Sequence, residues 1–228
     1  MIANKTVFFI IGLLLIVLGI AMLVPYSIQI LYNENSHSFV SSAFITVFIG
    51  VLLVLANLEK DLKLNLQQTF LFSTLAWVFV ALFGSLPFVL SPINFSFSEA
   101  FFESMSGITT TGATIITNLD ASPKSILIWR AIMQWLGGIG IVVMAITILP
   151  LLKVGGMQLF KMEGPDTTEK ILPRTIEVAS IIILTYFVLT LICSFLYWLF
   201  GMSVFDSIAH SMTTIATGGF STHNDSIG

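Results

Sequence analysis

Two short segments rich in threonine and glycine carry the most distinctive chemistry in the sequence. They read ITTTGAT (residues 108–114) and IATGGFS (residues 215–221). Glycine allows backbone conformations that direct consecutive carbonyl oxygens toward one axis, and threonine hydroxyls supply further oxygens or brace the loop. A ring of such oxygens can replace the hydration shell of a cation. The two segments therefore predict the walls of a pathway for a monovalent cation.

The two segments belong to a longer internal repeat. A shift of 107 positions without gaps places residues 97–114 on residues 204–221. Each loop follows a short, amphipathic, helix-like stretch, about 97–108 and about 204–214, of roughly half the length that a spanning helix needs. The shift pairs Glu99 with Asp206, Ser104 with Ser211, Met105 with Met212, Ile108 with Ile215, Thr110 with Thr217 and Gly112 with Gly219. We read the repeated unit as span, short helix, loop, span.

The composition indicates that the bilayer surrounds these elements. Of the 228 residues, 56% are hydrophobic and 9% are charged, whereas soluble domains carry roughly 25% charged residues. Five apolar segments are long enough to span a membrane, at about 7–31, 38–57, 67–91, 125–150 and 173–200. We expect a helix to begin at Pro173, since proline suits a first turn. Non-helical loops at membrane depth must be shielded by protein or line a water-filled path.

Charge distribution predicts the orientation and excludes one class of partner. A net charge of −3 argues against nucleic acid. The excess of Lys and Arg on one side places the N-terminus in the cytoplasm, and the acidic outer mouth concentrates cations. The inner side carries Lys5, Lys60, Lys63, Lys153, Lys161, Lys170 and Arg174, whereas the outer side carries Glu34, Glu99, Glu103, Asp120, Asp206 and Asp225.

Other polar residues admit two interpretations. Arg130 either braces the outer pore by pairing with Glu103 or a carbonyl near the loops, or extends to the outer interface. His210 and His223 with Asp206 are better explained as interfacial residues than as a metal site. The glycines at 137, 138 and 140 favour close helix packing. We find no catalytic constellation and predict no enzyme activity and no cofactor.

Three segments resemble the TrkH branch of the TrkH/KtrB/HKT potassium-transporter superfamily. They are FFESMSGITTTGATIITN (101–118), QWLGGIGIVVMAITILP (134–150) and SMTTIATGGFSTHNDSIG (211–228). The resemblance extends from about residue 67 onward, and the two N-terminal spans also fit the TrkH branch. It implies an all-α membrane protein with span–pore helix–filter loop–span repeats, of which two of an expected four are present and the second is incomplete.

The resemblance also implies residue roles. Gly112 and Gly219 match the filter glycines of repeats one and two, and glycine rather than serine is associated with potassium over sodium. The surrounding filter positions are Thr110, Thr111, Ala113, Thr217, Gly218 and Phe220; K⁺ is expected at Thr111, Gly112, Gly218 and Gly219, with Glu103 and Arg130 supporting the pore.

The resemblance further implies potassium uptake through the bacterial inner membrane, as a homodimer with a cytosolic, TrkA-like nucleotide-binding subunit. The expected organisation is a two-helix hairpin (1–65), a first repeat (66–152), a cytoplasmic loop (153–172) and a truncated second repeat (173–228). That loop is either a linker or a docking surface for a soluble partner.

One alternative is a secondary transporter that binds a small solute between broken helices. It predicts inverted repeats, whereas the repeat here keeps one orientation.

Overall fold

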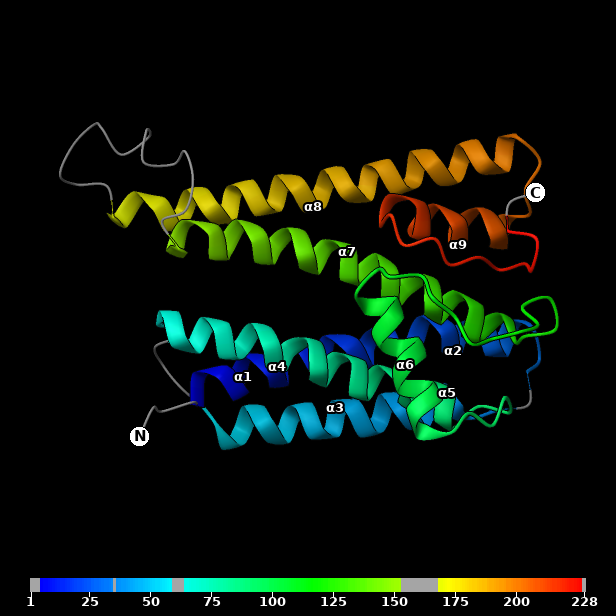
Figure 1. The fold of residues 1–228 in the computed structure, drawn as a ribbon, viewed down its shortest axis with the longest axis horizontal. Coiled ribbons are helices and arrows are strands. Elements are labelled where there is room, and N and C mark those ends of the chain that lie inside the picture. Colours follow the sequence, from blue (N-terminus) through cyan, green and yellow to red (C-terminus); the bar gives the residue numbers. More distant parts are fainter. Residues whose placement is uncertain (1–4, 35, 59–63, 153–167, 227–228) are drawn as a thin grey trace.

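The protein is all-helical over the residues that its computed structural model describes, which are 5–34, 36–58, 64–152 and 168–226. Figure 1 shows the helices arranged largely along one direction. In chain order they are α1 (Lys5–Ala21), α2 (Leu23–Leu31), α3 (Ser38–Ala56), α4 (Leu66–Gly84), α5 (Leu86–Val89), α6 (Phe97–Ile108), α7 (Lys124–Leu152), α8 (Thr168–Leu199) and α9 (Val204–Ile215).

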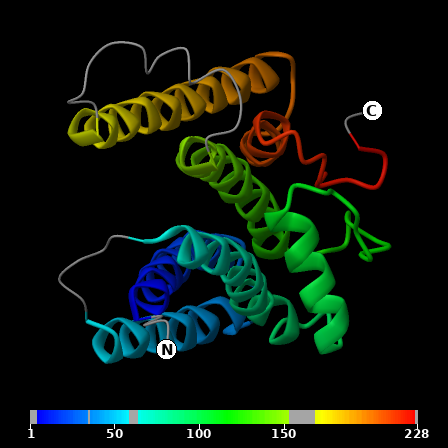
Figure 2. The ribbon, with the colours of Figure 1, turned by 60° about the vertical axis from the view of Figure 1, so that its left-hand side comes forward.

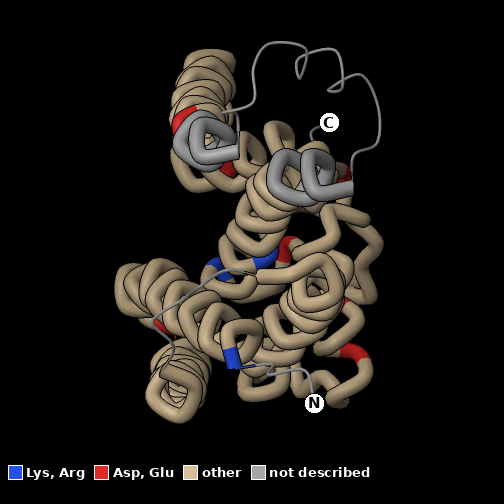
Figure 3. Tube along the Cα trace, turned by 90° about the vertical axis from the view of Figure 1, so that its left-hand side faces the viewer, with Lys and Arg blue, Asp and Glu red and all other residues tan. Residues whose placement is uncertain are grey.

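Five helical segments of the described chain are long and apolar enough to cross a membrane, as the sequence predicted. They are Lys5–Leu31, Ser38–Ala56, Leu66–Val89, Lys124–Met144 and Glu177–Leu199. Figure 3, a view along these helices, shows how few charged residues interrupt them. The short helices α6 and α9 have 12 residues each, too few to span a bilayer.

Two of the expected continuous spans are interrupted. The first breaks at Met22, between α1 and α2, because Pro25 has no N–H to donate to the carbonyl of Ala21. The third breaks at Ser85, since Pro87 lies in the first turn of α5 and cannot bond to Phe83. Each pair of helices still forms one apolar segment.

The expected start of the last span at Pro173 is wrong, since α8 begins five residues earlier, at Thr168. Proline removes one backbone donor, and the turns on either side supply enough hydrogen bonds to carry the helix through it. The expected cytoplasmic loop at 153–172 lies mostly outside the described residues.

Helix α7 is the centre of the arrangement. It packs against α6, α9, α8, α2 and α4, and 61% of its spanning window is buried, compared with 6% for α8. Figure 2 shows α7 between the α8–α9 pair and the layer formed by α1 to α4. A polar side chain on α7 therefore lies inside the protein, where it needs hydrogen-bonding partners.

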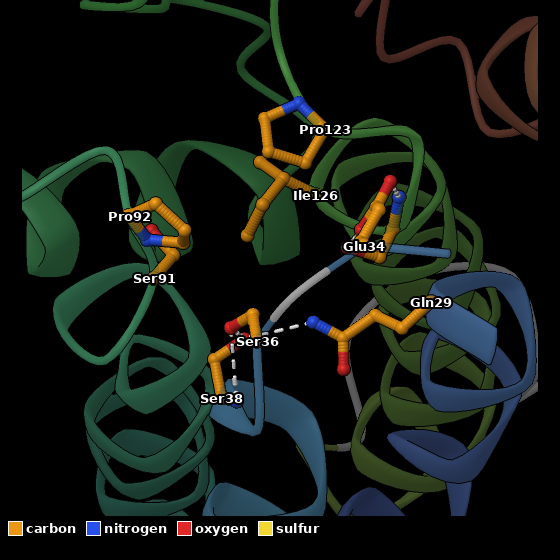
Figure 4. A pocket seen from close by; sticks show the side chains of 9 residues that line it. Gln29, Glu34, Ser36, Ser38, Ser91, Pro92, Pro123 and Ile126 are labelled. Carbon is orange, nitrogen blue, oxygen red and sulfur yellow. Dashed lines mark hydrogen bonds between the residues drawn. The ribbon is translucent and has the colours of Figure 1, made fainter. Parts of the chain in front are cut away.

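The connection between α2 and α3 reaches the start of α7. The Glu34 carboxylate accepts hydrogen bonds from the backbone N–H of Ser125, at 3.2 Å, and from its hydroxyl. Figure 4 shows the small pocket beside this contact, in which the Gln29 amide donates to the Ser38 hydroxyl. A carboxylate at the first turn of α7 also complements the positive end of the helix dipole.

Candidate functional site

The two short helices begin in the same way. Ser96 precedes α6 and its hydroxyl accepts from the backbone N–H of Glu99, while Ser203 precedes α9 and accepts from the N–H of Asp206. Each carboxylate in turn accepts from the serine hydroxyl. Serine three residues before an acidic residue is a helix-start signal, and the 107-residue shift also pairs Ser96 with Ser203, one residue before the repeat identified above.

The C-terminal ends of α6 and α9 also match. The N–H of Thr111 donates to Ser106 at 3.0 Å, and the N–H of Gly218 donates to Thr213 at 2.9 Å. One residue earlier, Thr110 and Thr217 each donate to the carbonyl three residues back, at 3.0 Å in both cases. This pattern is the Schellman motif, which closes a helix through a residue in the left-handed region.

That left-handed residue is a threonine in both loops, which is unusual. Thr110 has φ of 56° and Thr217 has φ of 54°. Schellman motifs normally place glycine here, because a β-branched side chain is strained at positive φ. Strain of this kind costs about 1–3 kcal/mol and clusters at functional sites. Its occurrence at equivalent positions of both loops indicates a functional constraint.

Each loop continues through a glycine that also has positive φ. Gly112 has φ of 77° and Gly219 has φ of 79°. A Cβ atom on Gly112 would lie 2.1 Å from the carbonyl oxygen of Gly218, so the two loops meet at this point. Left-handed residues two positions apart turn the peptide groups of each loop, which is how a short loop can present several carbonyl oxygens to one ion.

A polar side chain at the same position of each short helix holds the segment that follows the loop. The Glu103 carboxylate accepts from the Thr114 hydroxyl at 2.8 Å and from the Ile115 N–H at 3.1 Å. Its equivalent under the 107-residue shift is His210, whose Nε2 lies 3.1 Å from the Ser221 hydroxyl. Both side chains therefore fix the segment that leaves the loop.

Arg130 of α7 connects the two loops. Its Nε donates to Glu103 at 2.7 Å, and its Nη1 donates to the Ser221 carbonyl at 2.9 Å. The guanidinium carbon lies 4.0 Å from the centre of the Phe220 ring. Only 1% of Arg130 is exposed, which excludes the alternative that it extends to the outer interface.

Two glycines let α7 approach the ends of both short helices. A Cβ atom on Gly137 would lie 1.9 Å from the Ile108 carbonyl oxygen at the end of α6. A Cβ atom on Gly138 would lie 3.2 Å from the Cα of Ala216 at the end of α9, and 2.5 Å from the Tyr186 hydroxyl. The packing role expected from the sequence is thus what the geometry requires at these two positions.

A histidine joins the segments that follow the two loops. His223 Nδ1 lies 2.7 Å from Asp120, which follows the first loop, and its Nε2 lies 3.4 Å from Asp206 of α9. The hydrogen bond with Asp120 raises the pKa of His223 above its ordinary value. The same bond lowers the pKa of Asp120. No group of three or more metal-ligating side chains occurs among the described residues. The contact between His223 and Asp120 is an ion pair when the histidine is protonated.

The predicted residues fall into two groups. In the first group, at 110–112 and 217–219, the loop backbone is shaped by residues with positive φ. In the second group, at the ends of the loops, the backbone forms hydrogen bonds with side chains of the surrounding helices. The Ala113 carbonyl accepts from the Ser106 hydroxyl, and Phe220 is buried, with its N–H donated to Gln134. Sequence reasoning interpreted His210 as an interfacial residue, which is wrong because only 2% of it is exposed, and it assigned no role to Gln134. For His210 a signal was available, because the 107-residue shift places it on Glu103.

Five helical segments of the described chain that are long and apolar enough to span a membrane, together with two 12-residue helices that each lead into a loop, indicate a polytopic membrane protein. The profile of the TrkH family, described as cation transport protein, matches residues 7–228. The chain belongs to this family.

Similar proteins cover the chain almost completely. The Trk system potassium uptake protein TrkH of Vibrio parahaemolyticus is 42% identical over an alignment of 228 positions that covers 98% of this chain and 47% of that protein. The protein of the same name from Escherichia coli K12 is 43% identical over an alignment of 223 positions that covers 96% of this chain and 46% of that protein. The crystal structure of the potassium transporter TrkH from V. parahaemolyticus superposes with a TM-score of 0.85 at 40% identity, covering 96% of this chain and 44% of that one. The chain thus spans about half the length of these relatives.

Proposed function

We propose that this chain supplies two loops of a potassium-selective filter in a TrkH-type uptake pathway. The observation that carries the proposal is the pair of matched loops, in which a strained threonine and a positive-φ glycine recur 107 residues apart. A strained backbone at the same position of two loops indicates a functional constraint. The alignment of carbonyl oxygens on a dehydrated cation is such a constraint. The names of the relatives indicate potassium as that cation.

The ligands proposed for K⁺ are backbone oxygens at Thr111, Gly112, Gly218 and Gly219. The negative C-terminal ends of α6 and α9 add a favourable field for a cation. Thr110, Ala113, Thr217 and Phe220 complete the filter segments by setting the conformation and anchoring of the loops, and Glu103 with Arg130 supports them from behind.

The proposal extends to organisation and location. The hairpin at 1–65 precedes a first repeat at 66–152, a cytoplasmic loop at 153–172 and part of a second repeat at 173–228, and four such loops surround one pore. The excess of Lys and Arg at one end supports a cytoplasmic N-terminus in a bacterial inner membrane. The functional unit is a homodimer in lipid, with a TrkA-like nucleotide-binding subunit on the cytoplasmic side.

Serine substitutions at the filter glycines test the proposal. Gly112→Ser and Gly219→Ser should both lower the K⁺-over-Na⁺ permeability ratio of the complete pore, measured from reversal potentials in reconstituted bilayers. The control is Gly201→Ser, because Gly201 also has positive φ, at 104°, and lies between α8 and α9 rather than in a loop of the site.

The control and Gly219 are sterically matched, since no described atom lies within 4 Å of a Cβ built on either residue. Both serine substitutions therefore introduce the strain of a side chain at positive φ and no steric clash. A difference in the permeability ratio between them is then caused by the position of Gly219 in the filter loop. An unchanged permeability ratio in Gly219→Ser and Gly112→Ser would count against the assignment.

A further inference from the structure

Gln134 is a fully buried carboxamide in the middle of α7, one turn beyond Arg130. None of its side chain is exposed. A buried amide is costly unless its donor and its acceptor both find partners. The Gln134 Oε1 has one, since it accepts from the backbone N–H of Phe220 at 3.1 Å.

The amide lies where the two loops meet. A Cβ atom built on Gly218 would lie 2.3 Å from the Gln134 Cδ, 2.4 Å from its Oε1 and 2.6 Å from its Nε2. A Cβ atom on Gly112 would lie 3.7 Å from the same Nε2 and 2.1 Å from the Gly218 carbonyl oxygen. The Gln134 amide therefore fills the space beside Gly218 and reaches the first loop as well.

The donor side of the amide is unused by the described residues. Gln134 Nε2 is buried and has no hydrogen-bond partner among them. Leaving such a donor unpaired costs about 1–3 kcal/mol, and the loop residues beside it are Gly112 and Gly218. A buried side chain packed against these two residues limits how far their backbones can shift.

We propose that Gln134 is a positioning residue for ion selection. Its Oε1 fixes the second loop through Phe220, and its amide occupies the space beside Gly218 where the two loops meet. This inference rests on the proposed function of the loops as a filter and adds a residue outside them that sets their spacing. An ion-binding site needs its ligand atoms held within about 0.5 Å of their working positions. A buried side chain on a packed helix can hold them there.

The test compares two buried glutamines. Gln134→Met keeps the length of the side chain and removes both amide groups. Gln29→Met is the matched control, because Gln29 is also buried, donates one hydrogen bond to Ser38 and leaves its Oε1 unpartnered in the described structure, but it lies in the outer pocket of Figure 4. The readout is the K⁺-over-Na⁺ permeability ratio of the complete pore.

The expected result is a fall in this ratio of about threefold or more in Gln134→Met, corresponding to the loss of one hydrogen bond, with no change in Gln29→Met. An unchanged ratio in Gln134→Met overturns the inference. If that variant does not assemble, Gln134→Asn is scored in the same way, since it keeps both amide groups and withdraws them by one carbon.

The outcomes separate this inference from the proposed function. If Gly112→Ser lowers the ratio and the Gln134 variants do not, the loops form a filter and Gln134 does not position it. If neither changes the ratio, the filter assignment itself fails.

Discussion

Glu103 and Arg130 form an ion pair inside the protein, directly behind the two loops. Each residue is 1% exposed. The carboxylate accepts three hydrogen bonds, from Arg130 at 2.7 Å, the Thr114 hydroxyl at 2.8 Å and the Ile115 N–H at 3.1 Å. Glu103→Gln preserves the shape of the side chain but replaces one acceptor oxygen with a donor and leaves the guanidinium without its counter-charge.

The size of the effect follows from this burial. Removal of one partner of a buried ion pair costs about 3–5 kcal/mol, because the remaining charge stays in a medium of low polarity. For a chain of this length, each kcal/mol shifts the unfolding midpoint by about 2–4 °C. We therefore expect Glu103→Gln to lower Tm by at least about 6 °C, and to weaken K⁺-over-Na⁺ selection because Thr114 and Ile115 lose their anchor.

The assay is thermal unfolding of the purified protein in detergent, with the permeability ratio measured in parallel. Glu99→Gln is the matched control, since Glu99 lies on the same helix but is exposed. The double variant Glu103→Gln/Arg130→Met removes the unpaired charge as well, so it should recover part of the lost stability. It cannot recover all of it, because Arg130 also bonds to the Ser221 carbonyl.

Two results would refute this reasoning. One is a Tm for Glu103→Gln no lower than that of Glu99→Gln. The other is a double variant whose loss equals the sum of the two single losses, because the coupling between the charges would then be absent.

Two further predictions concern packing and pH. Gly137→Ala should destabilise the fold by about 1–3 kcal/mol, because its Cβ would lie 1.9 Å from the Ile108 carbonyl oxygen. Gly140→Ala should be neutral or stabilising, because its Cβ would meet only a ring atom at 3.9 Å. Thermal unfolding measures both variants, and equal losses of stability would contradict this prediction. The raised pKa of His223, caused by Asp120, means that its bridge is complete below a pH of about 6.5 and is lost as the pH rises through the raised value. Hydrogen exchange of the segments around Asp120 and His223, corrected for its intrinsic pH dependence, should show protection that falls across this pH window. The variant His223→Gln should show no such transition. A transition retained in that variant would show that another group is responsible.

The bilayer made most of the fold predictable from the sequence. Spanning helices need long apolar runs, so five of them stood out, and the 107-residue repeat located both short helices and both glycines. The breaks at Met22 and Ser85 were missed although Pro25 and Pro87 were visible, because the apolar run continues through each of them.

The residues behind the loops were harder to predict. Arg130 was recognised because a buried charge demands a partner, and Glu103 was a nearby candidate. Gln134 bonds to Phe220, 86 residues away, and nothing in the local sequence indicates which helix approaches which loop. Such contacts depend on the close packing that Gly137 and Gly138 permit.

We predict that a cation binds between the two loops through their backbone oxygens. Anomalous diffraction from crystals of the complete pore soaked with Rb⁺ or Tl⁺ tests it most directly, since both ions are heavy substitutes for K⁺. We predict an anomalous peak coordinated by the carbonyl oxygens of Thr111, Gly112, Gly218 and Gly219. A peak bound elsewhere, with these carbonyls turned away from it, would contradict the account.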